Sequence, residues 1–420
     1  MRVLGERHQV IDNRPSRVPD GGAFERQGFP MQRWRHAWPG LFATLNGVGL
    51  CRFAYTPLVP FLIAAGVVSG TEAAYLGATN LAGYLAGAAI AAPLAARIGL
   101  SLAIRLSFLA SILGIGATVL PGGFWWYLPW RFLAGGAGAA LMVLAPTYLL
   151  SEVDPGERGR VGGVIYTGVG AGIALSSLLV PPLAGSEIAW AWGALALGAL
   201  ATALLTWPRW RRRATIVLKR DRRLRLDLPV LLVMLAFGMD GVGFIPHMLF
   251  WVDYVARTLG RGVAAGSAQW LLLGLGATLG PALSGAIGDR LGLGRALVLA
   301  FVIKAVAVLL PALATATPLL AISSLAAGAL TPGIAALSAA RTTELVPPAE
   351  QTRAWGQATL VFGAFQAAGA YAMAFAYGQW HSYRPLYIAG AGFEVLGIAF
   401  ASAALLLAET RRSPVRNRSL

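Results

Sequence analysis

The chain has 420 residues, of which 57% are hydrophobic and only 12% are charged. Because soluble domains carry about 25% charged residues, this composition excludes a soluble protein and predicts an integral membrane protein. The formal net charge of +16 does not indicate a nucleic-acid partner, since no basic patch interleaved with aromatic residues belongs to a soluble domain. The single cysteine, Cys51, excludes an internal disulfide framework and a cysteine-based metal site.

Hydropathy and turn residues predict an all-α fold of twelve transmembrane helices. A helix needs about 20 apolar residues to cross roughly 30 Å of hydrocarbon. The predicted spans cover residues 38–63, 71–95, 103–121, 125–149, 161–183, 187–207, 228–252, 264–286, 296–315, 318–340, 354–377 and 384–408. Residues 1–36 lack the apolar core of a cleavable signal peptide. They predict a disordered, arginine-rich tail in which Met31 is an alternative start.

The distribution of positive charge predicts that both termini lie in the cytoplasm of a bacterium. The tails and alternate loops hold most of the 34 Lys and Arg residues, whereas the opposite loops hold only Arg257, Arg261 and Arg384. Cytoplasmic loops of membrane proteins are enriched in such residues. We therefore expect a monomeric, multi-pass protein of the inner (plasma) membrane, in contact with the lipid bilayer.

The spans fall into two halves of six, residues 37–207 and 228–408. A basic cytoplasmic linker, 208–227, separates them, and a cytoplasmic tail, 409–420, follows. Ala96-Arg-Ile-Gly99 after the second span matches Asp289-Arg-Leu-Gly292 after the eighth, 193 residues later. Pseudo-symmetric halves around a central cavity are a recurring plan of secondary transporters.

The first span carries an arginine near its middle. A charge at this depth costs at least a few kcal/mol unless it faces water or a partner. Tyr55 and Thr56 share the helical face of Arg52, and Pro57 and Pro60 favour a kink. These residues predict a lined cavity. The alternative is a structural arginine that binds the carbonyl groups of neighbouring helices.

The seventh span carries an acid and an imidazole seven residues apart, Asp240 and His247. Two helical turns place them on one face, about 10 Å apart. They form either a proton relay or a static arrangement in which Asp240 is the counter-ion of Arg52 or Arg131. Protons are therefore the expected coupling ion.

Other polar residues within the spans complete the candidate site. Gln357 and Gln366 are nine positions apart, hence on opposite helical faces, so at most one of them lines the pathway. Many such residues instead join helices to one another. The candidate substrate and proton pathway comprises Arg52, Tyr55, Asn80, Arg131, Asp240, His247, Trp270, Lys304, Gln357 and Glu394. Its three cations exceed its two carboxylates by one, which favours an anionic or zwitterionic substrate.

The loop after the eighth span reads Gly285-Ala-Ile-Gly-Asp-Arg-Leu-Gly-Leu-Gly-Arg295. It resembles the signature loop of the major facilitator superfamily, and the first half departs from it with Ala92 and Ala96. Trp130-Arg-Phe-Leu-Ala-Gly-Gly-Ala-Gly138 resembles a second motif of that family, which implies a coupling role for Arg131. The resemblance implies that the gating residues are Gly285, Asp289, Arg290, Gly292 and Arg295.

Within that superfamily the chain is similar to the YbfB/YjiJ-type branch. The likeness rests on the run from Arg52 to Pro60, on Asp240-Gly-Val-Gly-Phe-Ile-Pro-His247 and on Thr331-Pro-Gly-Ile334. It implies secondary transport and supplies no substrate.

These patterns together predict a secondary active transporter that moves a small organic solute by alternating access, coupled to protons. The alternatives are a drug or metabolite efflux proton antiporter and a non-transporting sensor on the same scaffold. An enzyme is not expected, because no metal or nucleophile cluster accompanies the one intramembrane histidine. Thr167-Gly-Val-Gly-Ala-Gly172 lies within an apolar helix without a preceding strand or a phosphate-binding lysine, so no nucleotide cofactor is expected either.

Overall fold

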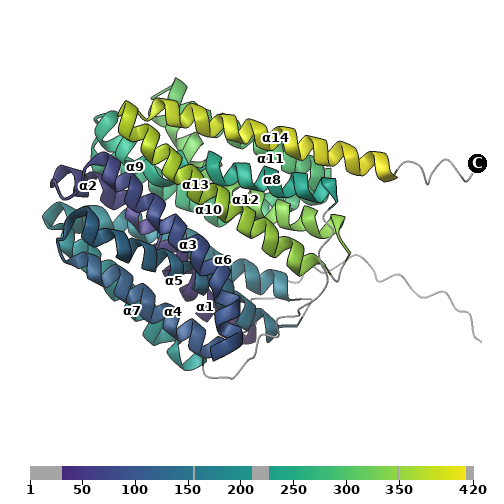
Figure 1. Cartoon of the computed structure of the whole chain (residues 1–420), viewed down its shortest axis with the longest axis horizontal. Helices are drawn as coiled ribbons and strands as arrows, with labels where there is room; N and C mark the ends of the chain where they lie inside the picture. Colours follow the sequence, from purple (N-terminus) through teal and green to yellow (C-terminus); the bar gives the residue numbers. More distant parts are fainter. Residues whose placement is uncertain (1–30, 155–156, 211–226, 348–349, 413–420) are drawn as a thin grey trace, which may run out of the picture.

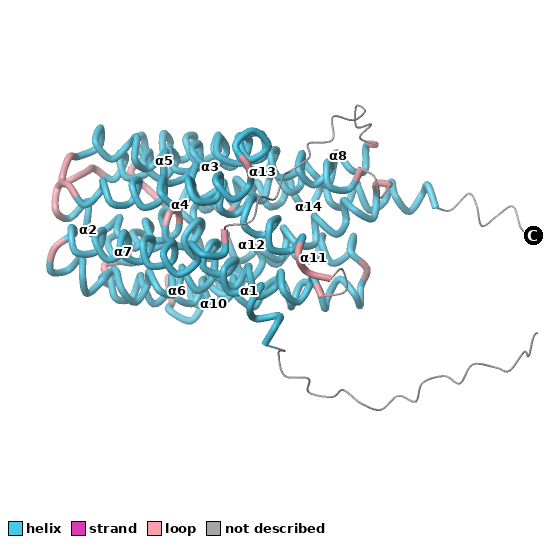
Figure 2. Tube along the Cα trace, turned by 90° about the horizontal axis from the view of Figure 1, so that it is seen from below, coloured by secondary structure: helices cyan, strands magenta, loops and turns pink. Residues whose placement is uncertain are grey.

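The computed structural model describes residues 31–154, 157–210, 227–347 and 350–412. Within these residues all regular structure is helical (Figure 2). The described residues hold 12 helices that are long and apolar enough to cross a membrane. Each coincides with one predicted span, which confirms the all-helical fold of twelve spans.

The N-terminal half contains the first six spans. Its first span is composite, and the others are single helices. In chain order the elements are α1 (Met31–Thr44), a π-helical segment (Leu45–Leu50), a 3-10 segment (Phe53–Leu58), α2 (Val59–Ala64), α3 (Gly70–Ile98), α4 (Leu100–Gly116), α5 (Gly123–Ser151), α6 (Arg158–Ser186) and α7 (Ile188–Thr206).

The C-terminal half repeats this order, again with a composite first span. Its elements are α8 (Leu228–Gly243), a π-helical segment (Pro246–Phe250), α9 (Trp251–Asp253), a second π-helical segment (Tyr254–Thr258), α10 (Gly262–Leu291), α11 (Leu293–Leu313), α12 (Thr317–Leu345), α13 (Gln351–Trp380) and α14 (Arg384–Arg412).

The ends of the halves differ slightly from the predicted boundaries. Helix α1 begins at Met31, so residues 31–36 of the predicted tail are helical, and α14 continues to Arg412. Residues 1–30, most of the linker and residues 413–420 lie outside the described part of the chain. Glycines end α3 and α10 at equivalent places. Gly99 has φ +89° and Gly292 has φ +84°, a conformation that residues with a Cβ rarely adopt.

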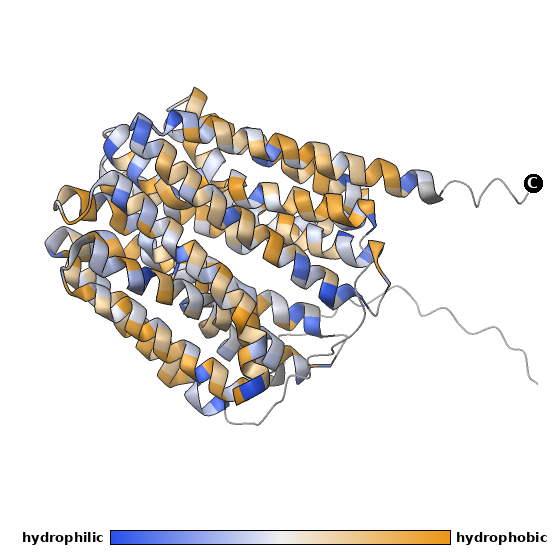
Figure 3. Ribbon diagram, viewed as in Figure 1, coloured by the Kyte–Doolittle hydropathy of each residue, from blue (hydrophilic) through white to orange (hydrophobic). Residues whose placement is uncertain are grey.

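The two halves lie side by side and converge at the end away from the chain termini (Figure 1). Across their boundary α3 packs on α13, and α6 packs on α10. Figure 3 shows apolar residues along the full length of the helices. Many of them point outward; Leu204, for example, is 63% exposed. An outer surface of this kind fits lipid contact, because hydrocarbon does not hydrate polar groups.

Glycines allow very close helix packing inside each half. A Cβ on Gly87 of α3 would lie 2.6 Å from Cα of Gly136 on α5. A Cβ on Gly280 of α10 would lie 2.7 Å from Cα of Ala329 on α12. Small residues let membrane helices approach to backbone contact. The same pair of helices, the second and the fourth, packs in this way in both halves.

Candidate functional site

The first and seventh spans are both interrupted within the membrane. The same sequence pattern accompanies each interruption: Asn46-Gly-Val-Gly in the first half and Asp240-Gly-Val-Gly in the second. Glycines weaken a helix, and Pro57 and Pro246 remove backbone donors. The π-helical and 3-10 segments result, and irregular segments of this kind are frequent at functional sites.

The interrupted segments meet where the halves join. Thr56 Oγ1 donates a hydrogen bond of 2.6 Å to the carbonyl of Met248. A second contact joins the Thr79 and Tyr371 hydroxyls at 3.0 Å. These bonds, together with those of Arg52 across the same boundary, are called the seam below. Thr56, Thr79, Met248 and Tyr371 lie in the part of their spans that is farther from the ends of the chain, and Arg52 and Gln366 lie near the middle of theirs.

Arg52 lies half-buried at the seam without a counter-ion. Its Nη2 donates to Gln366 Oε1 at 2.7 Å and contacts Met248 Sδ at 2.9 Å, both from the opposite half. Its guanidinium carbon lies 5.2 Å from the Phe53 ring centroid and 5.0 Å from that of Tyr84, which is cation–π distance. Among the described residues Arg52 forms no ion pair, and its Nε has no hydrogen-bond partner.

Of the two glutamines considered for the pathway, Gln366 contacts Arg52 and is 2% exposed. Gln357 is half-buried two and a half turns earlier, and its Oε1 has no hydrogen-bond partner among the described residues. Nine positions rotate a helix by half a turn, so the two side chains leave α13 in opposite directions. Gln366 is therefore the glutamine that meets Arg52 at the seam, whereas the predicted pathway residue Gln357 lies on the opposite face of α13.

Arg131 is a buried arginine that supports the interruption of the first span. Its Nη1 donates to the carbonyl of Cys51 at 3.1 Å, and its guanidinium lies 4.2 Å from the Tyr55 ring centroid. Asn80 Nδ2 donates to the same carbonyl at 3.1 Å and to the Arg131 carbonyl at 2.9 Å. The Tyr55 hydroxyl donates to the carbonyl of Ala73 at 2.9 Å. Arg131 therefore has the structural role that the sequence offered as an alternative for Arg52, namely binding a backbone carbonyl group of a neighbouring helix.

Asp240, Lys304 and Glu394 form a charged triad inside the C-terminal half. Lys304 Nζ donates to Asp240 Oδ1, lies 3.8 Å from Glu394 Oε1 and lies 4.9 Å from the Phe244 ring centroid. All three charged side chains are 0% exposed. They come from α8, α11 and α14, which pack together (Figure 1). The expectation that Asp240 pairs with an arginine of the first or fourth span is therefore wrong.

His247 hydrogen-bonds a serine instead of the acid on its own span. Its Nε2 lies 2.8 Å from Ser323 Oγ, and Ser323 Oγ donates to the Ala307 carbonyl at 2.6 Å. Since a hydroxyl has one proton, His247 Nε2–H is the donor to Ser323. No hydrogen bond joins His247 to Asp240 in the described part of the chain. The regular α-helix ends at Gly243, and His247 belongs to the π-helical segment that starts at Pro246, so the rotation of a regular helix does not apply.

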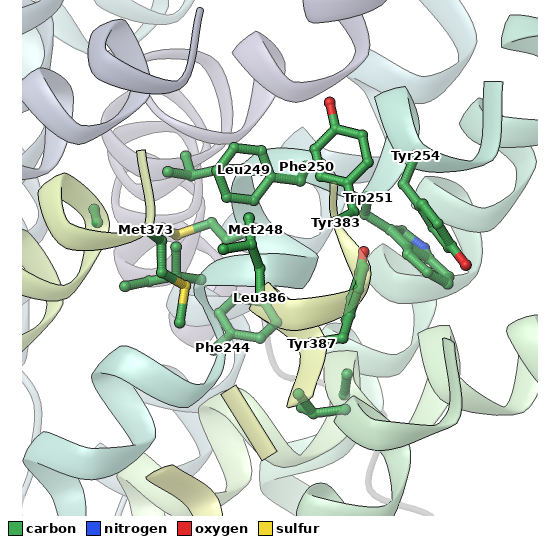
Figure 4. Close-up of a cluster of buried hydrophobic side chains, with 14 of the residues drawn as sticks. Phe244, Met248, Leu249, Phe250, Trp251, Tyr254, Met373, Tyr383, Leu386 and Tyr387 are labelled. Carbon is green, nitrogen blue, oxygen red and sulfur yellow. The ribbon is translucent and has the colours of Figure 1, made fainter. Parts of the chain in front are cut away.

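Aromatic side chains fill the end of the C-terminal half away from the termini. Figure 4 shows them between the seventh span and α13 and α14. Trp251 lies 4.7 Å from the His247 ring centroid, and Tyr383 lies 4.7 Å from that of Tyr377. Trp270 of α10 is fully buried and meets Phe53 at 5.9 Å. The predicted pathway residue Trp270 is thus part of the packed core beside the seam.

Sequence reasoning missed a buried acid in this cluster. Asp253 is 0% exposed and accepts hydrogen bonds from Arg257 Nη2 at 2.7 Å and from the Tyr383 hydroxyl. Burial, and then the Asp253 carboxylate, raises the pKa of Tyr383, which remains a donor. The four-residue spacing of an acid and an arginine was the available signal. Because Asp253 and Arg257 neutralise each other, the excess of one intramembrane cation is unchanged.

The predicted gating loop joins α10 to α11 at the end that carries the termini. Asp289 and Arg290 are exposed in the last turn of α10, Gly292 ends that helix, and Gly285 has open space where a Cβ would stand. Arg295 Nη2 lies 3.7 Å from Glu409 Oε1 of α14. Both this pair and the Arg341–Glu344 ion pair of α12 line a pocket of about 160 Å³. The loop therefore contacts the ends of two neighbouring helices.

Twelve spans in two repeated halves, with interrupted first helices that meet at a charged seam, define the fold of a major facilitator transporter. The sequence profile of the family described as uncharacterised MFS-type transporter YbfB matches residues 44–402. The chain belongs to this family of membrane transporters. A comparison with the curated proteins gave no match.

Solved structures show the same fold. A bacterial homologue of the human lysosomal transporter Spinster, in an inward-facing and occupied conformation, is 16% identical with a TM-score of 0.66. The match covers 89% of this chain and 97% of that one. The inward-facing and unoccupied conformation of such a homologue is 17% identical with a TM-score of 0.65. That match covers 90% of this chain and 98% of the other.

Proposed function

We propose that this transporter moves a small anionic or zwitterionic organic solute across the bacterial inner membrane by alternating access, coupled to protons. The observation that carries the proposal is the unpaired charge of Arg52. It lies half-buried where the halves meet, with neutral partners from both of them. A substrate carboxylate or phosphate would supply the missing counter-charge.

The surroundings of Arg52 suit such a ligand. Phe53 and Tyr84 offer ring faces, while Gln366 and Met248 are neutral groups that a stronger anionic acceptor can displace. Charge-assisted hydrogen bonds are roughly twice as strong as neutral ones. A ligand that exchanges the seam contacts of Arg52 for its own would favour separation of the halves at this end, which is the step that alternating access requires.

The charge distribution supports the orientation. The predicted gating loop, the linker and both tails carry the positive excess, so these parts are assigned to the cytoplasm. The seam lies toward the opposite, periplasmic end. The described contacts between the halves therefore correspond to a conformation closed on the periplasmic side, like the inward-facing structures that the fold resembles.

Transport assays in proteoliposomes test the proposal. Purified protein is reconstituted with a trapped pH-sensitive dye and challenged with dicarboxylates, amino acids and lipophilic cations. We expect proton movement in response to anionic or zwitterionic compounds. The variant Arg52→Gln should weaken apparent affinity about 10- to 100-fold, since a hydrogen bond to a charged group contributes about 1.5–3 kcal/mol.

The control is Arg261→Gln. Arg261 is half-buried at the periplasmic end and away from the seam, where it donates to Thr317 Oγ1 at 2.9 Å and to the Thr315 carbonyl, so its loss should leave transport at the wild-type level. A preference for lipophilic cations would contradict the anionic-substrate proposal and favour drug efflux. Equal transport by Arg52→Gln and wild type would remove Arg52 from the site.

A further inference from the structure

We propose that Asp240, Lys304 and Glu394 form the site that binds the coupling proton, with Glu394 as the carboxyl that holds it while Lys304 neutralises Asp240. This inference rests on the proposed function, because a coupling proton requires a coupled transporter. It also separates two sites. The proton binds inside the C-terminal half, and the solute binds at Arg52 on the seam.

The charges of the triad do not balance. One ammonium group faces two carboxylates, and all three side chains are 0% exposed. Lys304 donates to Asp240, whereas its Nζ lies 3.8 Å from Glu394, beyond hydrogen-bond distance. An uncompensated buried charge carries a penalty of several kcal/mol. Binding one proton removes that charge, and the carboxyl without the hydrogen bond to lysine is the one free to take it.

Unpartnered polar atoms mark the same place. Asp240 Oδ2 and both oxygens of Glu394 have no hydrogen-bond partner among the described residues. Buried polar groups are satisfied in the great majority of cases, and exceptions call for a specific explanation. A proton on Glu394 shared with a water molecule or with the Asp240 carboxylate would satisfy these atoms.

The N-terminal half holds a neutral counterpart of the triad. Asn46, Ser111 and Thr202 stand about 193 residues before Asp240, Lys304 and Glu394, on the equivalent first, third and sixth spans. Asn46 Nδ2 donates to Thr202 Oγ1 at 2.8 Å and to the Ala199 carbonyl at 3.0 Å. Ser111 Oγ donates within its own helix at 2.7 Å.

This comparison decides between a structural and a functional role for the charges. The same three-helix junction is built with neutral hydrogen bonds in one half, so the packing of a half does not require ions at these positions. Buried ion pairs seldom stabilise a fold better than neutral residues of similar volume. The charged version in the C-terminal half therefore serves a purpose other than holding the helices together.

The neighbouring groups leave this triad as the centre of titration. From the seventh span His247 faces Ser323, and from α14 the Tyr387 hydroxyl lies 3.4 Å from the Pro246 carbonyl. Helix α12 contributes Ser323, and α13 faces the backbone of α8 with apolar side chains such as Phe362 and Phe365 at Gly241 and Gly238. The charged groups that act on one another at this junction are those of the triad.

The triad has a direct physical connection to the seam. Asp240 stands in the last turn of α8, and the interrupted segment that follows contains Met248. Met248 contacts Arg52 with its sulfur and Thr56 with its carbonyl. A change of charge at Asp240 and Lys304 therefore acts on the segment that holds the solute-binding arginine, which links proton binding to the state of the seam.

Infrared spectroscopy of the reconstituted protein tests the site without a substrate. A protonated carboxyl has a carbonyl stretch that an ionised one lacks. We expect wild type at neutral pH to show a band of this kind, sensitive to exchange into D₂O, that disappears in Glu394→Gln and remains in Asp253→Asn. Asp253 is the matched control, because it is equally buried but fully paired with Arg257 and Tyr383.

Other outcomes overturn the inference. A band that survives in Glu394→Gln and disappears in Asp240→Asn would place the proton on the other carboxyl, and a band that neither variant removes would exclude the triad as the site. The neutral variant Asp240→Asn/Lys304→Met/Glu394→Gln is matched in size and should fold without the band. Its failure to fold, judged by size-exclusion chromatography, would show that the charges are structural.

Proton flux separates this inference from the proposed function. Solute-evoked proton movement in wild-type proteoliposomes that is lost in Glu394→Gln supports both. Movement that Glu394→Gln retains overturns the inference and leaves the coupled transporter in place. If wild type moves solute without protons while the band depends on Glu394, the proposed coupling fails, and with it the role of the triad as a coupling site.

Discussion

Replacement of the buried lysine gives the sharpest test of the charge arrangement. Lys304→Met keeps the length of the side chain and leaves two buried carboxyl groups without a cation. With Glu394 protonated, the interaction that is lost is the buried ion pair between Lys304 and the Asp240 carboxylate. Loss of one partner of a buried pair typically costs about 3–5 kcal/mol. We expect the free energy of unfolding to fall by an amount in this range.

The chain contains its own reporter of unfolding. Cys51 is the single cysteine, and it is 0% exposed, so a fluorescent maleimide reacts with it only after the protein opens. Because each 1.4 kcal/mol is a factor of ten, Lys304→Met should label roughly 100- to 4,000-fold faster than wild type in detergent. The control is Ile303→Met on the same helix, where the side chain is 41% exposed and no change is expected.

The pH dependence of this variant has a definite sign. Without Lys304 the folded chain must bind an additional proton, whereas the unfolded chain at neutral pH does not. The stability of the variant relative to wild type therefore falls as pH rises, by about 1.4 kcal/mol per pH unit for the one additional proton. Adding Asp240→Asn should restore most of the stability, because one carboxyl then remains. If Lys304→Met and Ile303→Met label at the same rate, Lys304 does not neutralise buried carboxylates and the charge argument fails.

Three further predictions concern the supports of the site. Arg131→Met removes the guanidinium that binds the Cys51 carbonyl and should accelerate maleimide labelling by about 5- to 150-fold, as expected for one lost hydrogen bond of about 1–3 kcal/mol. Unchanged labelling would show that Arg131 does not support the first span. Asp253→Asn should lower the free energy of unfolding by only about 1–2 kcal/mol, because the Arg257 side chain is 37% exposed and water can hydrate its charge once the carboxylate is gone. A larger loss, measured by thermal unfolding, would show that Arg257 is not hydrated in the variant. Gly280→Leu places a side chain within 2.7 Å of the backbone of α12 and should prevent correct packing. Gly285→Ala is the control, because Gly285 has open space around it, and it should give a normal size-exclusion profile. Equal profiles of the two variants would show that the close packing is not required.

The twelve spans could be predicted because each is a continuous apolar segment, and its length is set by the thickness of the bilayer. The partners of the buried charges could not. Arg52 and Gln366 are separated by 314 positions, and Asp240 and Lys304 by 64. No local pattern specifies which spans will be neighbours, so an arginine of the first span looked as suitable a partner for Asp240 as a lysine of the ninth.

The histidine relay illustrates a second limit. The spacing of Asp240 and His247 places them on one face only if the helix between them is regular. With the Gly-Val-Gly pattern and Pro246, the regular helix ends at Gly243 and a π-helical segment that contains His247 starts at Pro246; a π-helix takes more residues per turn. His247 then hydrogen-bonds Ser323 instead. Glycine and proline in the same seven residues were the signal that regular geometry should not be assumed.

The seam is made of neutral and singly charged hydrogen bonds instead of a large interlocked ion network. Such bonds contribute about 0.5–1.5 kcal/mol each when neutral and about 1.5–3 kcal/mol when one partner is charged. Reversing a two-state population from 1:99 to 99:1 takes about 5.5 kcal/mol. The summed free energy of the bonds from Thr56, Thr79 and Arg52 is comparable to that value. The closure at the seam is thus weak enough for the proposed ligand and the proposed coupling proton to reverse together.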